Sequence, residues 1–428
     1  MEKEFVAYLK KNGHFRRLLL SLKSNYERLG HLGGTIRVID ATPEEIHAIE
    51  GLLGISFYGE TEIKITYQKL MKRLVGTKFE GIDFSKVLTL YFGEPIITKQ
   101  AQRAGEQLSI ENAISTLMSI YENSYAMKWI THIHSSNPTL FTKCIKQFLV
   151  DQTLVVKSLD ALNRLPLWQD KITSLSVFAT DVAKDPHFFD KGLPATILSD
   201  AIHYFLGNEK KIANGIERNK NFLKAGLMKE DTQNFCITSR IFAKTQNGMD
   251  HTGISYFSNC YEPLNLNVGN LLSIDQIYKV KLVIIVENPS VFHVLNETAK
   301  EHTLENIAFV CTNGELNLAT HLLLDKLHEG NIRMYYAGDF DPEGLLIADK
   351  LKRKYDKNLH FWGYELENYE KAMSSKVLDH SRLKKLKNCL SVELEKIKEV
   401  LIDRKQPGYQ EALILWYQDE MLKIVTSI

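Results

Sequence analysis

Residues 331–349 read NIRMYYAGDFDPEGLLIAD, and this stretch decides the fold of the C-terminal part of the chain. An apolar run of strand length ends at Gly338 and is followed by three carboxylates within five residues. A proline stands between the second and third carboxylates, where it suits the first turn of a helix. The pattern predicts a buried strand, a short acidic turn and a helix that begins at Pro342.

The sequence on both sides continues this alternation of strand and helix. VKLVIIVE at 280–287 is a continuous apolar run rich in Val and Ile, typical of a strand buried on both faces. Four strands alternate with three helices through short connections, which indicates an α/β domain with a parallel, Rossmann-like sheet. The predicted strands are 280–287, 306–311, 331–338 and 359–364, and the predicted helices are 289–300, 314–328 and 342–354.

Carboxylates follow two of these strands. Glu287 ends the first strand, and Asp339 and Asp341 follow the third. In a parallel sheet the carboxyl ends of the strands share one edge, so the three side chains are expected in one crevice. Three carboxylates at such short distances repel one another unless a cation lies between them. Mg²⁺ or Mn²⁺, which also binds waters and phosphate oxygens, is the natural partner.

The flanking residues fit such a site, although a second interpretation stays open. Gly338 and Gly344 allow close backbone approach, and the helix that starts at Pro342 favours an anion at its N-terminus. Taken alone, a D-x-D-P-E-G string is also typical of a surface turn. The acid at the end of a different strand favours the site over the turn.

The rest of the chain is read more coarsely. Residues 1–30 are predicted to form one amphipathic helix, 35–40 a short strand, and 61–75 a helix; Thr42-Pro43 is a helix start. We expect three domains: a mainly helical N-terminal arm (1–115), a mixed region without a fold assignable from periodicity (116–275), and the α/β domain with a helical tail (276–428).

Composition sets outer limits on the function. The chain has 428 residues, is 44% hydrophobic and 25% charged, and carries a net charge of +1, which neither demands nor excludes nucleic acid. Five scattered cysteines, with no signal peptide and no long apolar segment, predict a soluble, cytoplasmic protein without a membrane anchor. Neither G-x-x-x-x-G-K-[ST] nor G-x-G-x-x-G occurs at a strand end, so we expect no nucleotide to bind this chain.

A glutamate after one strand and D-x-D after a later one resemble the Toprim domain of topoisomerases, primases and old-type nucleases. The form GDFDPEG is similar to that of the type VI topoisomerase A subunit and the Spo-eleven proteins. The closer resemblance is to the Toprim-bearing (JetD-like) nuclease subunit of Wadjet plasmid-defence systems. It is carried by IIVENPSVF (284–292), VCTNGELN (310–317) and YYAGDFDPEGLLIA (335–348), with LSVFATDVAKDPHFFDKGLPATIL (175–198) upstream and PGYQEAL (407–413) downstream.

The resemblance implies an architecture and an activity. Its members combine an N-terminal arm, a winged-helix-like (CAP-like) domain and a C-terminal Toprim domain. They are dimeric, metal-dependent DNA endonucleases that act beside an SMC-like ATPase, a kleisin and a small winged-helix subunit on closed circular plasmid DNA. Carried over to this chain, residues 116–275 would be the winged-helix-like domain and the chain a homodimer.

The resemblance also implies roles for single residues. Glu287 would be the general acid/base or a metal ligand, and Asp339 and Asp341 would be metal ligands. Glu343 is a weaker candidate ligand, and Asn288 would be a supporting residue of the ENP motif. Glu411 falls where the family tends to have paired acids. Here the first of the pair is Gln410, which puts the role of Glu411 in doubt.

Two groups of basic residues have two interpretations each. Either they contact DNA phosphates, or they form solvated helix faces. They are Lys210, Lys211, Arg218 and Lys220 in the middle region and Lys384 and Lys385 in the tail.

Two other functions remain open on the sequence. A topoisomerase-like transesterase would need a tyrosine nucleophile, and none of the 18 tyrosines lies in a motif that matches one, so attack by water is preferred. A non-catalytic DNA-binding assembly subunit would bind DNA without metal and leave it uncut.

Overall fold

The computed structural model describes residues 1–428 except 12, 210–211, 213, 230–233, 315 and 427–428. The chain forms two compact units, residues 1–156 and 157–428, and the division falls within helix α9 (Gln152–Asn163). Each unit has a core of its own and is described by itself.

The first unit is mainly helical. Strands β1 (Thr35–Val38) and β2 (Ile63–Thr66), which are separated along the chain by a helix, pair antiparallel with Ile36 opposite Ile65. A core rich in Phe, Leu and Ile fills the space between these strands and α1 to α5. The helices are α1 (Glu2–Lys11), α2 (Arg16–Leu29), α3 (Pro43–Leu53), α4 (Tyr67–Leu74), α5 (Phe84–Phe92), α6 (Lys99–Ile120), α7 (Tyr125–Ser136) and α8 (Pro138–Val150).

Two predictions for this unit are wrong and two are confirmed. Residues 1–30 form two helices rather than one, because Gly13 takes a left-handed conformation with φ of 57°. The stretch 61–75 begins as strand β2, since Ile63 and Ile65 are buried while Lys64 is exposed, a period of two. The strand predicted at 35–40 is present, and Thr42 caps α3 in a capping box.

The second unit begins with helices and ends with an α/β sheet. Helices α10 (Leu175–Ala183), α11 (Gly192–Phe205) and α12 (Gly215–Lys224) lie between two short strands, β3 (Thr173–Ser174) and β4 (Leu227–Met228), which pair in parallel. The middle of the chain therefore contributes mostly helix to this unit.

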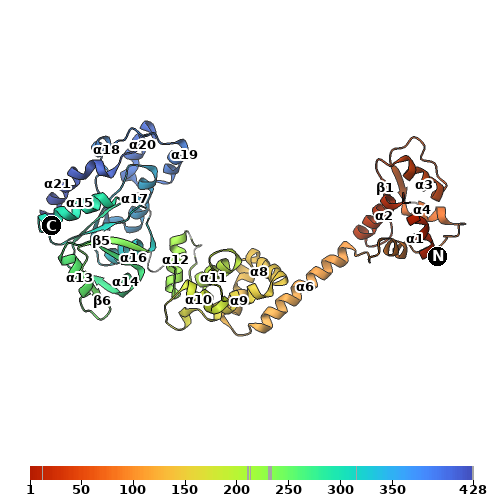
Figure 1. The fold of residues 1–428 in the computed structure, drawn as a ribbon, viewed down its shortest axis with the longest axis horizontal. Coiled ribbons are helices and arrows are strands. Elements are labelled where there is room, and N and C mark those ends of the chain that lie inside the picture. The colour runs from red at the N-terminus through yellow and green to blue at the C-terminus, as the bar shows by residue number, and fades with distance from the viewer. Residues whose placement is uncertain (12, 210–211, 213, 230–233, 315, 427–428) are drawn as a thin grey trace. The chain divides into compact units, whose positions relative to one another are not determined.

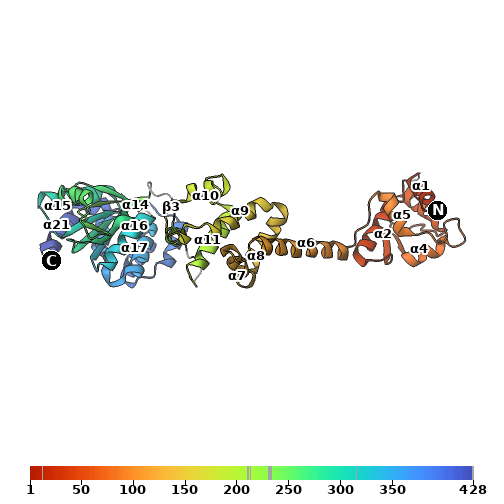
Figure 2. The same cartoon turned by 90° about the horizontal axis from the view of Figure 1, so that it is seen from below.

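A mixed, mostly parallel sheet of six strands organises the rest (Figures 1 and 2). Its order is β12-β11-β9-β10-β5-β7, in which β12, β11, β9 and β10 are parallel and β5 and β7 extend the edge antiparallel. The strands are β5 (Phe235–Ser239), β7 (Leu264–Asn267), β9 (Leu282–Val286), β10 (Ile307–Cys311), β11 (Arg333–Ala337) and β12 (Leu359–Phe361).

The predicted alternation of strands and helices from residue 280 onward is confirmed. Every residue of β9 and of β10 is buried, which explains their unbroken apolar sequence. The connecting helices are α15 (Pro289–Glu301), α16 (Leu318–Glu329) and α17 (Pro342–Tyr355). α15 packs with the C-terminal helix α21 (Ile414–Thr426) on one face, and α16, α17 and α14 (Val268–Ser273) cover the other (Figure 2).

The remaining elements close the unit around this sheet. β6 (Ala243–Thr245) and β8 (Ile274–Ile277) form a separate antiparallel pair. The others are α13 (Thr252–Asn259), α18 (Leu366–Ala372), α19 (His380–Leu383), α20 (Glu395–Arg404) and the 3₁₀ turns η1 (Pro166–Trp168), η2 (Asp356–Asn358), η3 (Lys384–Asn388), η4 (Val392–Leu394) and η5 (Gln410–Leu413).

Strand order identifies where a ligand would bind in the sheet. From β9 the chain moves one way through α15 to β10, then crosses back through α16 to β11 on the other side of β9. The direction of winding therefore reverses between β9 and β11. In open α/β sheets, ligands bind outside the carboxyl ends of the strands at such a switch point.

The expected domain boundaries lie inside elements of the structure. The division at 115/116 falls within α6, and that at 275/276 falls within β8. Strands β5 and β7 come from residues before 276 and yet belong to the sheet. In the part of the chain that the structure describes, no helix is long and apolar enough to cross a membrane.

Candidate active site at the carboxyl edge of the sheet

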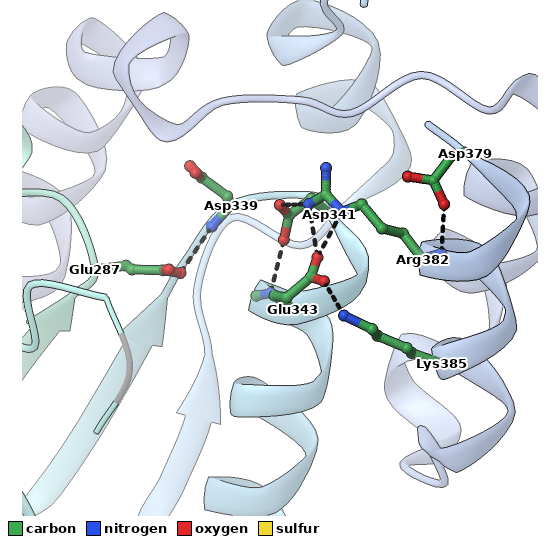
Figure 3. A network of polar contacts seen from close by, with 8 residues as sticks. Glu287, Asp339, Asp341, Glu343, Asp379, Arg382 and Lys385 are labelled. Carbon is green, nitrogen blue, oxygen red and sulfur yellow. Dashed lines mark hydrogen bonds and ion pairs between the residues drawn. The ribbon is translucent and has the colours of Figure 1, made fainter. Parts of the chain in front are cut away.

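Glu287 and Asp339 lie side by side at the switch point. Val286 is paired with Ala337 in the parallel β9–β11 ladder, so the residues that follow each strand emerge together. The Asp339 backbone N–H points to Glu287 Oε2 at 3.4 Å (Figure 3). Asp339 Oδ1 accepts a hydrogen bond of 2.9 Å from the Gln410 backbone N–H.

Glycine is required at 338 because the site is crowded there. A Cβ on Gly338 would lie 2.9 Å from Glu287 Oε2, 2.9 Å from the Tyr364 hydroxyl and 3.0 Å from the Tyr336 hydroxyl. Real Cβ atoms do not come that close to three oxygens. The absence of a side chain therefore lets Glu287 reach the start of the acidic turn.

Burial and like charge raise the pKa of both carboxyls. Removal from water, reinforced by the neighbouring Asp339, raises the pKa of Glu287 to about 7. Removal from water also raises the pKa of Asp339 to about 6, despite the hydrogen bond from Gln410. Among the described residues, the ion pairs at this site go to Asp341 and Glu343, and none goes to Glu287 or Asp339. These two groups thus lack a positive partner from the described protein.

The start of the 3₁₀ turn η5 lies against the residue that follows Glu287. The Asn288 backbone N–H donates to Gln410 Oε1 at 3.1 Å, and Asn288 Nδ2 donates to Glu411 Oε1 at 2.6 Å. Gln410 is fully buried, whereas Glu411 is exposed. Glu411 therefore lies beside the site, and Gln410 connects Asp339 to the ENP segment through its backbone and side chain.

Asp341 has a different environment from Asp339. Asp339 and Asp341 flank the buried Phe340, whose N–H and carbonyl both pair with Gly408. Asp341 Oδ1 caps α17 by accepting the Gly344 N–H at 2.8 Å. Its Oδ2 binds Arg382 Nη2 at 2.5 Å (Figure 3). Both oxygens of this expected metal ligand are thus occupied by protein groups.

Glu343 is held by two basic side chains. Arg382 donates to Glu343 Oε2 from Nη2 at 2.6 Å and from Nε at 3.0 Å, and Lys385 Nζ binds Oε1 at 2.7 Å. Partial burial acts against ionisation, but these hydrogen bonds outweigh it and hold the pKa of Glu343 below its usual value. The carboxylate of Glu343 is therefore held in ion pairs with Arg382 and Lys385, apart from the pair that Glu287 forms with Asp339.

The basic residues that the sequence analysis considered for DNA contacts differ in exposure and in ion pairing. Arg218 and Lys384 are exposed. Lys220 on α12 forms an ion pair with Asp325 on α16, which also binds Lys354. Lys385 binds Glu343, as described above, and Lys210 and Lys211 lie outside the described residues.

Two of the carboxylates at the switch point are suited to bind a hard divalent cation. Glu287 and Asp339 are oxygen ligands with raised pKa values and no basic partner among the described residues. Mg²⁺ commonly uses one or two carboxylates and completes its shell with waters and phosphate oxygens. Within the described ranges no group of three or more His, Cys, Asp or Glu side chains is arranged to hold a metal ion. Asp341 is turned to Arg382, which explains why a third carboxylate does not converge.

Arg382 and Gln410 are the site residues that sequence reasoning missed. Arg382 lies in a Lys-rich helical tail where nothing distinguishes it from a solvated residue. Gln410 stands out in the sequence only as a departure from an acidic pair. Their contacts join segments 41 and 71 residues apart along the chain, which periodicity does not detect.

The chain matches two family models. Residues 32–240 match the family described as "Protein of unknown function N-terminus (DUF3323)". Residues 264–420 match the family described as "Protein of unknown function C-terminus (DUF2399)", and this range holds every residue of the site. No curated protein matches the chain.

Proposed function

We propose that the chain is a metal-dependent DNA endonuclease that hydrolyses a phosphodiester at the β9–β11 switch point. The observation that carries this proposal is the pair Glu287 and Asp339. Both are buried enough to have raised pKa values, and both lack a basic partner among the described residues. Such a pair at the ligand-binding edge of an α/β sheet is typical of a functional site rather than of a surface turn.

Both carboxyls would hold the ion, and Glu287 would have a second task. It would accept a proton from an attacking water and return it to the leaving oxygen. Asp339, held by Gln410, would be a ligand of Mg²⁺ or Mn²⁺ together with Glu287. The ion, when bound, would supply charge stabilisation on the phosphate and a more acidic water.

The wider setting is proposed from the sequence resemblance. We propose that residues 116–275 correspond to a winged-helix-like domain and residues 276–428 to a Toprim domain, and that the chain acts as a homodimer. Its partners would be an SMC-like ATPase, a kleisin and a small winged-helix subunit of a plasmid-defence complex. Its substrate would be double-stranded, closed circular DNA.

Plasmid cleavage tests the catalytic proposal. The purified protein is incubated with supercoiled plasmid in Mg²⁺, in Mn²⁺ or in EDTA, with and without the partner subunits. We expect metal-dependent nicking or linearisation that Glu287→Gln and Asp339→Asn abolish. Glu305→Gln, which removes an exposed carboxylate outside the site, is the matched control and should cut normally.

Other outcomes separate the rival functions. DNA binding without cleavage under every condition, partners included, would favour the binding subunit and refute the nuclease. Protein trapped covalently on DNA by denaturant would favour the tyrosine transesterase. Tyr336 and Tyr364, which lie next to Glu287, are poor nucleophiles for that reaction because burial holds the pKa of each well above its usual value.

A further inference from the structure

The carboxylates of this site form two halves, which differ in whether basic side chains neutralise them. In one half, Glu287 and Asp339 have no basic partner among the described residues. In the other half, Asp341 and Glu343 share the guanidinium of Arg382, and Glu343 also binds Lys385 (Figure 3). A site that bound two metal ions would need the second half to be free.

Arg382 donates hydrogen bonds to an oxygen of each of these two carboxylates, Asp341 and Glu343. It reaches Asp341 Oδ2 and Glu343 Oε2 with the same Nη2 atom, at 2.5 and 2.6 Å, and adds Nε to Glu343. The remaining oxygen of Asp341 caps α17. A cation that bound Asp341 would have to displace either the guanidinium or the helix cap.

The position of Arg382 is built into the fold. Its backbone N–H donates to Asp379 Oδ1, which caps α19, at 2.9 Å. Downstream, the buried Asp349 on α17 accepts the backbone N–H groups of Leu390 and Ser391 at 2.9 and 2.7 Å. The cap fixes the backbone of α19 at Arg382, and the far end of the segment is held by the same helix that Asp341 caps.

We infer that Arg382 takes the place of a second cation, so that the site holds one divalent ion, bound by Glu287 and Asp339. This inference rests on the proposed metal-dependent activity and specifies it. The charges agree with it: Arg382 and Lys385 neutralise Asp341 and Glu343. Of the carboxylates that remain, Glu411 is exposed to solvent, whereas Glu287 and Asp339 are half-buried, and one divalent ion neutralises that half-buried pair.

Counting bound Mn²⁺ tests this without any cleavage assay. Free Mn²⁺ is measured by electron paramagnetic resonance during titration of the full chain, and the bound ion is expressed per chain. Wild type should bind one ion. Arg382→Gln should bind two, because Asp341 and Glu343 then lose a shared positive charge.

Three further variants locate the extra ion. Arg382→Gln combined with Asp341→Asn should bind one ion, and asparagine keeps the cap on α17. Arg382→Lys keeps a positive charge and should also bind one. Lys387→Gln removes an exposed positive charge from the same segment and should leave the count at one.

The possible failures are distinguishable. Two ions on the wild-type chain would refute the role of Arg382 and leave the nuclease proposal standing, and this measurement needs no variant to fold. One ion on a folded Arg382→Gln, checked by its melting curve, would refute it as well. No ion on wild type at millimolar Mn²⁺ would refute the metal-dependent function, and the inference with it.

Discussion

Glu287→Gln should make the metal-free protein more stable at neutral and alkaline pH, although it removes the residue most central to the site. The folded-state pKa of Glu287 is raised to about 7 by burial and by Asp339, from an ordinary 4.5. A carboxyl group whose pKa is higher in the folded than in the unfolded state binds its proton more tightly in the folded protein. This stabilises the folded state fully below pH 4.5, and the stabilisation is lost as the pH rises through 7.

The size of the effect follows from the difference between the two pKa values. Ionising Glu287 in the folded protein costs about 3 kcal/mol relative to the unfolded chain. Glutamine has the same shape and an oxygen that can accept the Asp339 N–H, so it removes the charge without removing that contact. For a unit of this size, the expected rise in melting temperature at pH 8 is on the order of 5–10 °C.

Thermal unfolding of wild type and Glu287→Gln in EDTA measures the difference at pH 8 and at pH 5.5. The gap should be large at pH 8 and should shrink at pH 5.5, where the wild-type carboxyl is protonated. Added Mn²⁺ should raise the melting temperature of wild type more than that of the variant. Glu305→Gln, outside the site, should follow wild type throughout.

A Glu287→Gln variant that melts at or below wild type in EDTA at pH 8 would refute this reasoning. It would mean that Glu287 is solvated or paired, and that the pair with Asp339 carries no electrostatic strain. A gap that stays constant between pH 5.5 and pH 8 would be equally damaging, because it would point to packing rather than charge.

Three further substitutions test the surroundings of the site and the first unit. Asp349→Ala should lower the unfolding free energy by about 3 kcal/mol in urea denaturation, because it leaves buried donors without their acceptor. Gly344→Ala would put a Cβ against the Asp339 carbonyl oxygen, so kcat/KM for plasmid cleavage should fall by on the order of 100-fold, with the fold retained by circular dichroism. Thr42→Ala should cost about 1 kcal/mol through the lost cap of α3, seen as an earlier urea transition of the first unit, without changing Mn²⁺ binding.

The parallel part of the sheet could be predicted because its signal is local. β9 and β10 are buried on both faces, so each is an unbroken apolar run, and the helices that follow them, α15 and α16, begin at the N-caps Asn288 and Asn317. The juxtaposition of Glu287 with Asp339 follows from one rule about the carboxyl ends of neighbouring strands. The rule applies only if β9 and β11 are neighbours in the sheet, which the sequence does not show. The structure pairs the two strands directly.

The other parts of the fold depend on contacts distant in sequence. β5 and β7 precede the parallel strands along the chain and join the sheet edge antiparallel, so the α/β pattern does not reveal them. The sequence pattern predicts helix at β2 because a short amphipathic strand runs directly into α4, and the helical period of α4 dominates the window. Arg382 could be recognised only once α19 was placed beside α17.

The acidic turn therefore holds three carboxylates with three separate tasks. Asp339 lies at the switch point beside Glu287, Asp341 caps the helix that Pro342 begins, and Glu343 anchors Arg382 from the first turn of that helix. The spacing explains the division: Phe340 is buried between the two aspartates, and the cap turns Asp341 toward α17. If the one-ion inference holds, a count of acids in such a turn overstates the number of metal ligands. What separates a ligand from a cap or an anchor is whether a basic side chain already holds its oxygens.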